Sequence, residues 1–350
     1  MRYTTFGTRT GIRVSEYALG SASFGTNWGG ADLRQSRRIL DRFAEAGGTL
    51  IDTADVYGFG QAEEVLGELL GADRDSFVLA GKYTLGTHPD LGVSRTGNNR
   101  KSMKYALHGT LKRLGTDHLD VYLVHQPDSV TPTEEIVGAL DDLVRAGDIR
   151  HGGLSNFPAW RTAYAASLAD RLNRSATLAG LQIEYNLLDR GGDREILPAA
   201  QAFGLGVMLY SPLGGGLLTG KYRTGEQGRL SGPVAIGQKE DTPQKRATLD
   251  ALLKVSADTG EKPARIAMAW LRHRARQWAT PLIPVIGPRT LEQLEDYLAA
   301  LDLTVSQEHL EALDAVSAPA VEYPETSLRS YADAVLGGVS DRFDRVRPVA

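Results

Sequence analysis

Hydrophobic residues along the chain follow two alternating patterns. Short, unbroken apolar runs predict buried strands, and between them lie longer stretches in which apolar residues recur every three to four positions, as on one face of a helix. Met103, Leu107, Leu111 and Leu114 show this helical spacing. The predicted strands are Tyr17–Leu19, Leu50–Ile51, Phe77–Ala80, Leu119–Val124, Ile149–Leu154, Gly180–Ile183, Val207–Tyr210 and Leu282–Ile286.

Two shorter runs precede this series, Tyr3–Phe6 and Ile12–Val14, and the Gly and Thr residues between them predict an N-terminal β-hairpin. Asp32 is the predicted N-cap of the first helix, and Gly47–Gly48 end that helix. Eight strand–helix units favour an α/β fold of the (β/α)8 TIM barrel type, and a doubly wound sheet is the competing arrangement. Because no segment is typical of a linker, we expect residues 1–350 to form one domain.

Two long irregular segments, Tyr83–Asn98 and Leu213–Thr242, each follow a predicted strand. In a barrel, loops of this kind lie over the C-terminal face, where active sites are found. The tail after Ala318 contains proline and weak periodicity, and we expect it to cover part of that face or the barrel wall.

Composition and charge narrow the function. The 350 residues include no cysteine, which excludes disulfides, thiolate metal sites and a cysteine nucleophile. The histidines show no spacing typical of a metal site. A net charge of −4 does not favour nucleic-acid binding. The chain has no apolar run of about 18 residues and no signal-peptide pattern, so we expect a cytoplasmic protein without membrane contact.

Four polar residues lie at or just after the ends of three successive barrel strands: Asp52, Tyr57, Lys82 and His125. A phenol, with a pKa of about 10, is a poor acid near neutrality, but a neighbouring ammonium stabilises the phenolate. A carboxylate would keep the ammonium charged, and an imidazole would orient a carbonyl oxygen. The set suits proton transfer to a developing alkoxide, although each residue alone is also common in packing, solvated or helix-capping positions.

Longer motifs support this interpretation. They run through Phe43–Gly58, Arg113–Asp117, Gly153–Phe157, Tyr210–Tyr222 and Gly287–Leu294. With these motifs the chain resembles the aldo-keto reductases from its N-terminal Phe6–Gly11 segment to about Asp302. Its long loops are similar to those of the larger bacterial and fungal members, near the potassium-channel β subunits and the aryl-alcohol dehydrogenases.

The resemblance implies a barrel that binds NADP(H) and reduces an aldehyde or ketone to the alcohol. It assigns Tyr57 as the proton donor, Lys82 with Asp52 as the pair that makes Tyr57 a better acid, and His125 as the group that orients the carbonyl. The nicotinamide would supply hydride to the carbonyl carbon. The expected partner is a small-molecule carbonyl substrate.

The same resemblance implies a set of cofactor contacts. Amide and hydroxyl groups would hold the carboxamide, Tyr210 would stack on the nicotinamide, a Gly-rich loop would hold the pyrophosphate, and Arg289 would bind the 2′-phosphate. The implied residues are Asp52, Ser21, Asn27, Ser155, Asn156, Gln182, Tyr210, Ser211, Leu213, Gly215, Lys221, Gly287, Arg289 and Gln293. Asp296 and Tyr297 depart from the usual glutamate and asparagine of the adenosine end.

Several alternatives stay open at this point. Gly215–Tyr222 partly matches a P-loop but has Tyr222 where magnesium needs Ser or Thr. A barrel of this kind can be a ketoreductase of a secondary-metabolite or nucleotide-deoxysugar pathway, or an NADP(H)-binding sensor or partner subunit with slow turnover. Phe24 and Trp28 are candidates for an aromatic wall of the substrate pocket. The sequence leaves the substrate and the oligomeric state open.

Overall fold

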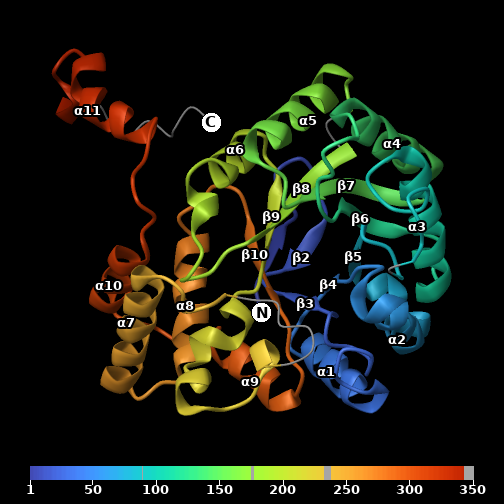
Figure 1. Cartoon of the computed structure of the whole chain (residues 1–350), viewed down its shortest axis with the longest axis horizontal. Coiled ribbons are helices and arrows are strands. Elements are labelled where there is room, and N and C mark those ends of the chain that lie inside the picture. The colour runs from blue at the N-terminus through green and yellow to red at the C-terminus, as the bar shows by residue number, and fades with distance from the viewer. Residues whose placement is uncertain (89, 175–176, 232–237, 343–350) are drawn as a thin grey trace.

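The computed structural model describes residues 1–88, 90–174, 177–231 and 238–342 (Figure 1). The chain opens with the predicted hairpin, in which β1 (Tyr3–Thr5) pairs antiparallel with β2 (Arg13–Ser15). The backbone N–H of Thr8 donates to the carbonyl of Gly204, just before a barrel strand begins (2.9 Å). The hairpin therefore covers the amino-terminal end of the barrel.

Eight parallel strands close into a barrel in the order β10-β3-β4-β5-β6-β7-β8-β9. They are β3 (Ala18–Gly20), β4 (Leu50–Asp52), β5 (Val78–Tyr83), β6 (Leu119–Val124), β7 (Ile149–Ser155), β8 (Leu178–Glu184), β9 (Gly206–Tyr210) and β10 (Leu282–Ile286). Because β10 pairs with both β3 and β9, the sheet has no edge, and the predicted barrel is confirmed over the doubly wound sheet.

Side chains alternate between the inside and the outside of the barrel along each strand, as the two-residue period requires. Leu50, Ala80, Val121 and Met208 belong to one buried cluster that also contains Phe6 of the hairpin. The second cluster, between the strands and the surrounding helices, is larger and includes Ile51, Leu79 and Tyr122. The barrel interior is thus a filled core, and polar side chains lie at the carboxyl ends of its strands.

Helices surround the barrel (Figure 1). They are α1 (Leu33–Glu45), α2 (Gln61–Leu70), α3 (Arg100–Leu114), α4 (Thr133–Ala146), α5 (Ala159–Arg171), α6 (Ile196–Ala202), α7 (Pro243–Thr259), α8 (Pro263–Ala275), α9 (Leu291–Ala299), α10 (Gln307–Ser317) and α11 (Glu325–Val335). The predicted cap is confirmed at α1, where the Asp32 carboxylate accepts from the N–H of Gln35 at 2.7 Å. The chain then leaves the helix at Gly47, which has φ +87°.

The two long loops begin at the carboxyl ends of β5 and β9, as predicted. The first connects β5 to α3. The second contains the short 3-10 helices η5 (Gly214–Thr219), η6 (Lys221–Thr224) and η7 (Arg229–Ser231), and its residues 232–237 lie outside the described part.

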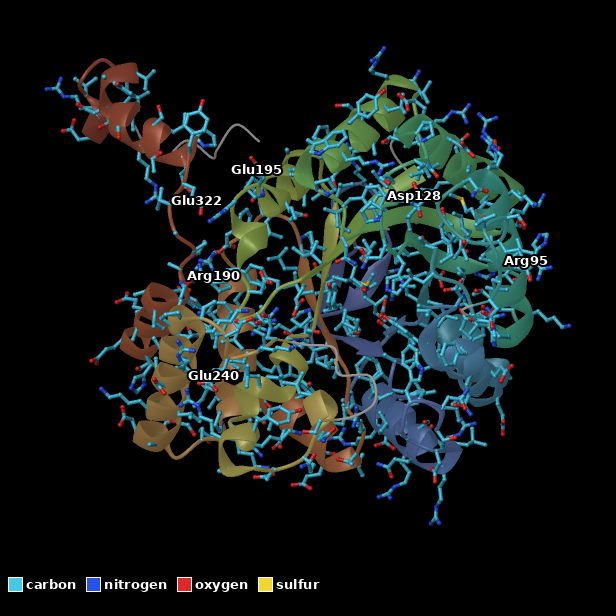
Figure 2. All side chains as sticks on the ribbon, in the orientation of Figure 1. Arg95, Asp128, Arg190, Glu195, Glu240 and Glu322 are labelled. Atoms are coloured by element: carbon cyan, nitrogen blue, oxygen red, sulfur yellow. The ribbon has the colours of Figure 1, made fainter. Side chains whose placement is uncertain are left out.

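The expectation for the C-terminal tail is wrong. Helix α11 lies away from the barrel in Figure 1, and none of its residues is buried. Glu322, which forms an ion pair with Arg194 of the barrel, marks the segment that leads out to α11 (Figure 2). Up to residue 342, where the described structure ends, the tail does not cover the barrel, and its apolar residues, such as Leu328 and Tyr331, are mostly exposed. No helix within the described ranges is long and apolar enough to span a membrane.

Candidate active site

A buried ion pair lies at the carboxyl ends of β4 and β5. The Nζ of Lys82 donates to Oδ1 of Asp52 at 2.5 Å and to the carbonyl of Thr53 at 2.9 Å. Both side chains are almost completely buried. Burial alone would lower the pKa of Lys82, but the Asp52 carboxylate and Tyr57 together outweigh it and the pKa is raised. The ammonium is therefore charged at neutral pH.

Tyr57 lies directly over this pair. It follows β4 and starts the short 3-10 helix η1 (Tyr57–Gly60). The Nζ of Lys82 is 5.0 Å from the centroid of the Tyr57 ring, and Tyr57 favours the charged ammonium through Coulombic attraction and a hydrogen bond. The phenol and the ammonium are thus near enough for Lys82 to stabilise a phenolate.

His125 directly follows β6 and lies beside Tyr57. Its ring meets the Tyr57 ring edge-on, with centroids 5.9 Å apart and planes at 85°. Burial lowers the pKa of His125 to about 3, and the charge of Lys82 adds to this effect. The imidazole is therefore neutral near pH 7. Its Nδ1 is buried and has no hydrogen-bond partner within the described structure.

Polar side chains from the next strands continue the site. Ser155 ends β7, and Gln182 in β8 donates from Nε2 to Oδ1 of Asp52 at 2.7 Å. Asn156 has a left-handed backbone, with φ +61°. Its Nδ2 donates to the carbonyl of His125, and its Oδ1 accepts from the Tyr210 hydroxyl, each at 3.0 Å. These hydrogen bonds connect the amide groups to the charged cluster.

The loop after β9 forms a narrow backbone turn beside a lysine. Ser211 has φ +52°, and Gly215 and Gly216 have φ +70° and +94°. A Cβ at Gly216 would lie 3.5 Å from Cε of Lys221, an ordinary contact distance, so it is the positive φ that favours glycine here. Leu213 accepts the N–H of Gly216 at 2.9 Å and so begins the turn.

The segment after β10 contains the remaining predicted positions. Gly287 is exposed, and the backbone N–H of Arg289 donates to Oε1 of Gln293 in α9 at 2.8 Å. Asp296, which departs from the usual glutamate, forms ion pairs with Lys262 and Arg265, each at 2.9 Å. Tyr297 packs against the core.

Ser21 and Asn27 contact the segment that carries Tyr57. The Ser21 hydroxyl donates to Oγ1 of Thr53 at 2.8 Å, and Nδ2 of Asn27 donates to the carbonyl of Gly58 at the same distance. The structure thus brings the predicted residues to one end of the barrel, with Asp52, Tyr57, Lys82 and His125 at the ends of β4–β6 and the others around them.

Comparison with known proteins agrees with this geometry. A model of the Aldo/keto reductase family matches residues 17–318, which is most of the chain. The chain belongs to this family. An uncharacterized oxidoreductase of Bacillus subtilis is 36% identical over 93% of this chain and 99% of its own length. Norsolorinic acid reductase of Aspergillus flavus is 32% identical over 92% of this chain and 84% of its own length. A protein of Schizosaccharomyces pombe named "Putative voltage-gated potassium channel subunit beta" is 32% identical over 84% of this chain and 86% of its own length.

The predicted resemblance is confirmed, and this aldo-keto reductase is an oxidoreductase. Members of the family typically use NAD(P)H. The residues present fit such a dinucleotide, because the amides of Asn156 and Gln182 suit a carboxamide and the ring of Tyr210 suits a flat heterocycle. The Lys221 amine, which lies beside the turn at Gly216, suits a pyrophosphate.

The sequence analysis missed the residues that hold the loops of this aldo-keto reductase. Asn186 is fully buried, and its Nδ2 donates to the carbonyl of Ser211 at 3.0 Å. Gln238, beyond the undescribed part of the second loop, donates from Nε2 to Oε1 of Glu184 at 2.8 Å. Neither position carries a periodic signal, since each contact depends on how distant segments meet.

Proposed function

We propose that this protein reduces an aldehyde or a ketone to the alcohol, with NADPH as the hydride donor and Tyr57 as the proton donor. One observation supports the proposal above the others: a buried, charged Lys82–Asp52 pair lies under the Tyr57 ring, with a neutral His125 at its edge.

The proposed roles follow from charge and position. Lys82 stabilises the phenolate that remains after Tyr57 has given its proton to the developing alkoxide. Asp52 keeps Lys82 protonated and directs its Nζ. His125, neutral near pH 7, donates an N–H to the substrate carbonyl oxygen, which places that oxygen within reach of the phenol.

NADPH supplies hydride to the carbonyl carbon when it is bound. Ser155, Asn156 and Gln182 would hold its carboxamide, and Tyr210 would lie flat against the nicotinamide. Lys221 and the backbone N–H of Gly215 would bind the pyrophosphate. Arg289 would hold the 2′-phosphate.

The substrate class is proposed from the aromatic side chains beside Tyr57. The Trp28 ring lies 6.3 Å from the Tyr57 ring and 5.8 Å from the Phe59 ring, both edge-on. Phe59 is 48% exposed. Phe24, in contrast, is a core residue, so of the two candidates for the wall only Trp28 is used in this proposal. A flat aromatic carbonyl compound would pack best against Trp28 and Phe59.

A second candidate function is favoured by the relative that is named a channel β subunit. In that case the protein would bind NADPH tightly and turn over slowly. Measured turnover separates the two candidates, because a sensor or partner subunit would hold NADPH without oxidising it at a useful rate.

The test follows NADPH oxidation with a panel that contains an aryl aldehyde, a quinone, a small ketoaldehyde and a keto-sugar. Tyr57→Phe should lower kcat by about 10²–10⁴-fold. NADPH affinity, measured by fluorescence, should be unchanged because only the transferable proton is lost. Tyr3→Phe, on the exposed hairpin, is the matched control. Turnover retained by Tyr57→Phe would refute the assigned proton donor.

A further inference from the structure

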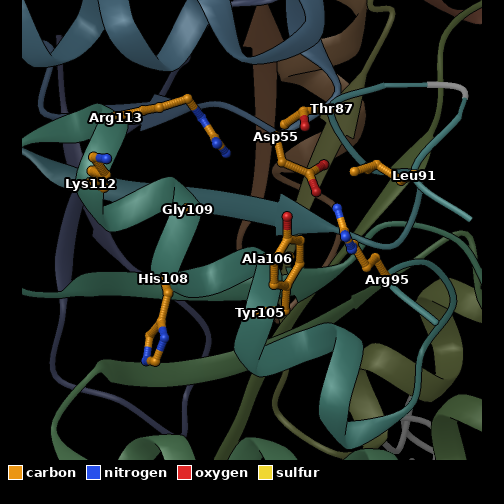
Figure 3. Close-up of a pocket in the computed structure, with 11 residues that line it drawn as sticks. Asp55, Thr87, Leu91, Arg95, Tyr105, Ala106, His108, Gly109, Lys112 and Arg113 are labelled. Carbon is orange, nitrogen blue, oxygen red and sulfur yellow. The ribbon is translucent and has the colours of Figure 1, made fainter.

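A cavity lies outside the barrel wall, between α3 and the loop that follows β5. Its volume is about 470 Å³, within the range of small-molecule sites. It is lined by Asp55, Gly86, Thr87, Leu91, Arg95, Tyr105, Ala106, His108, Gly109, Lys112 and Arg113 (Figure 3). None of the residues proposed for hydride transfer or cofactor binding lines it. Figure 2 places Arg95 on the opposite side of the barrel from Glu240, which is in the loop after β9.

The floor of the cavity is a carboxyl group that the reaction does not use. Asp55 is 1% exposed, and its Oδ1 has no hydrogen-bond partner within the described structure. In Figure 3 this carboxyl points toward the ends of Tyr105 and Arg95. Buried polar atoms nearly always have partners, so an unpaired one at the base of a cavity calls for a donor from outside the chain. Burial, with repulsion from Glu63, raises the pKa of Asp55 to about 7.

The rim of the cavity is positively charged. Arg95 and Lys112 are both exposed, and neither forms an ion pair among the described residues. The Arg95 guanidinium lies over the Tyr105 ring, 5.6 Å from its centroid. Arg113 adds no net charge, because it is paired with the buried Glu63 at 2.7 Å. The rim therefore attracts an anion, while the floor accepts a hydrogen bond.

We propose that this cavity binds a hydroxylated phosphate ester of the sugar-phosphate class. The phosphate would contact Arg95, whose guanidinium lies near the Asp55 carboxyl in Figure 3, since a guanidinium matches its charge and oxygens. Lys112, at the other end of the cavity, would add attraction at longer range. A hydroxyl of the same molecule would donate to Oδ1 of Asp55. Such a ligand supplies both a negative charge for the rim and a hydrogen-bond donor for the floor. Inorganic phosphate has no sugar hydroxyl to reach the floor, and a neutral sugar has no charge for the rim.

Isothermal titration calorimetry tests this site on the full chain saturated with NADP⁺, so that the cofactor's phosphate-binding groups are occupied. Glucose 6-phosphate is the probe, and methyl phosphate is the probe without free hydroxyls. We expect glucose 6-phosphate to bind about tenfold more tightly than methyl phosphate. Arg95→Ala should weaken it about tenfold, and Lys112→Ala should weaken it less. Lys101→Ala, an exposed lysine of α3 that does not line the cavity, should leave binding unchanged.

Asp55→Leu tests the floor separately from the rim. This variant should reduce glucose 6-phosphate affinity to that of methyl phosphate, because only the hydroxyl contact is lost. Absence of binding by glucose 6-phosphate, or binding that Arg95→Ala and Lys112→Ala leave unchanged, would overturn the proposal. Equal affinity of the two probes would likewise contradict the assigned floor contact. Reductase activity is a separate readout, so failure here leaves the proposed function standing.

Discussion

The carboxyl end of the barrel has two halves, which differ in how their polar side chains are held. At the ends of β4 to β6, charged side chains are buried and pair with each other, as Lys82 does with Asp52. At the ends of β7 to β10, the polar groups are mostly uncharged and sit on turns, such as Asn156 and Ser211 with positive φ. The first half is therefore sensitive to the loss of one partner of a charged pair, whereas the second half is held by backbone and loop contacts.

This difference predicts which property a substitution changes. Removing one charge from the first half leaves another charge buried and alone, so stability and chemistry should both fall. Removing a group from the second half exposes no buried charge. Such a change should weaken cofactor binding and leave the free energy of unfolding nearly unchanged.

The largest effect is expected for Lys82→Met. The variant should lose at least about 10²-fold in kcat, because the phenolate of Tyr57 would lose its counter-charge. Its free energy of unfolding should fall by about 3–5 kcal/mol, because the Asp52 carboxylate would stay buried without its ammonium. Steady-state kinetics and urea unfolding measure the two effects on one preparation.

The double variant Asp52→Asn with Lys82→Met is the control for this prediction. It removes both charges, so it should recover most of the lost stability but none of the activity. A double variant as unstable as Lys82→Met would contradict the view that the unpaired carboxylate is the cause.

The second prediction compares two carboxyls that lie three residues apart. Asp52 accepts from Lys82 and Gln182, whereas Oδ1 of Asp55 accepts from nothing in the described structure. Burial raises the pKa of Asp55 from 3.8 to about 7, so between these values the native state binds more protons than the unfolded state. Stability should therefore fall by about 4 kcal/mol as pH rises through this window and stay level above it.

Asp55→Asn should remove that loss, so the variant should gain stability over the parent as pH rises from 4 to 8. The difference between the two proteins is the quantity to measure, by urea midpoints at each pH. Burial lowers the pKa of His125 from 6.5 to about 3, which makes stability rise with pH over an overlapping window and masks the slope in the parent. Asp73→Asn, at an exposed carboxyl, is the matched control. Parallel profiles for the parent and Asp55→Asn would refute the prediction.

The same division explains how much could be predicted from the sequence. Each residue of the charged half follows an apolar run, and the end of such a run marks the carboxyl edge of a barrel strand. The third apolar run ends at Ala80, although Lys82 was predicted to end the strand, and β5 continues to Tyr83. The Asp52 carboxylate compensates the burial of Lys82 inside the barrel. Polarity alone would have ended the strand too early.

Contacts of the loops could not be predicted in this way. Asn186 and Gln238 act through partners more than 20 residues away along the chain. Phe24 was expected in the pocket but is in the core, because an apolar side chain has the same pattern in either place. The unpaired Oδ1 of Asp55 could not be predicted either, since burial of an atom without a partner depends on packing and not on residue type.

The smallest effect tests the loop half. Arg289→Ala should weaken NADPH binding about tenfold or more and leave NADH binding unchanged, because only NADPH carries the 2′-phosphate. The urea midpoint should not move, since Arg289 is half-buried at the surface and not in the core. Arg276→Ala is the matched control, because this exposed arginine precedes β10 and so lies at the other end of the barrel. Equal losses for NADPH and NADH would remove Arg289 from the 2′-phosphate, and a large fall in stability would show that the two halves do not differ as argued.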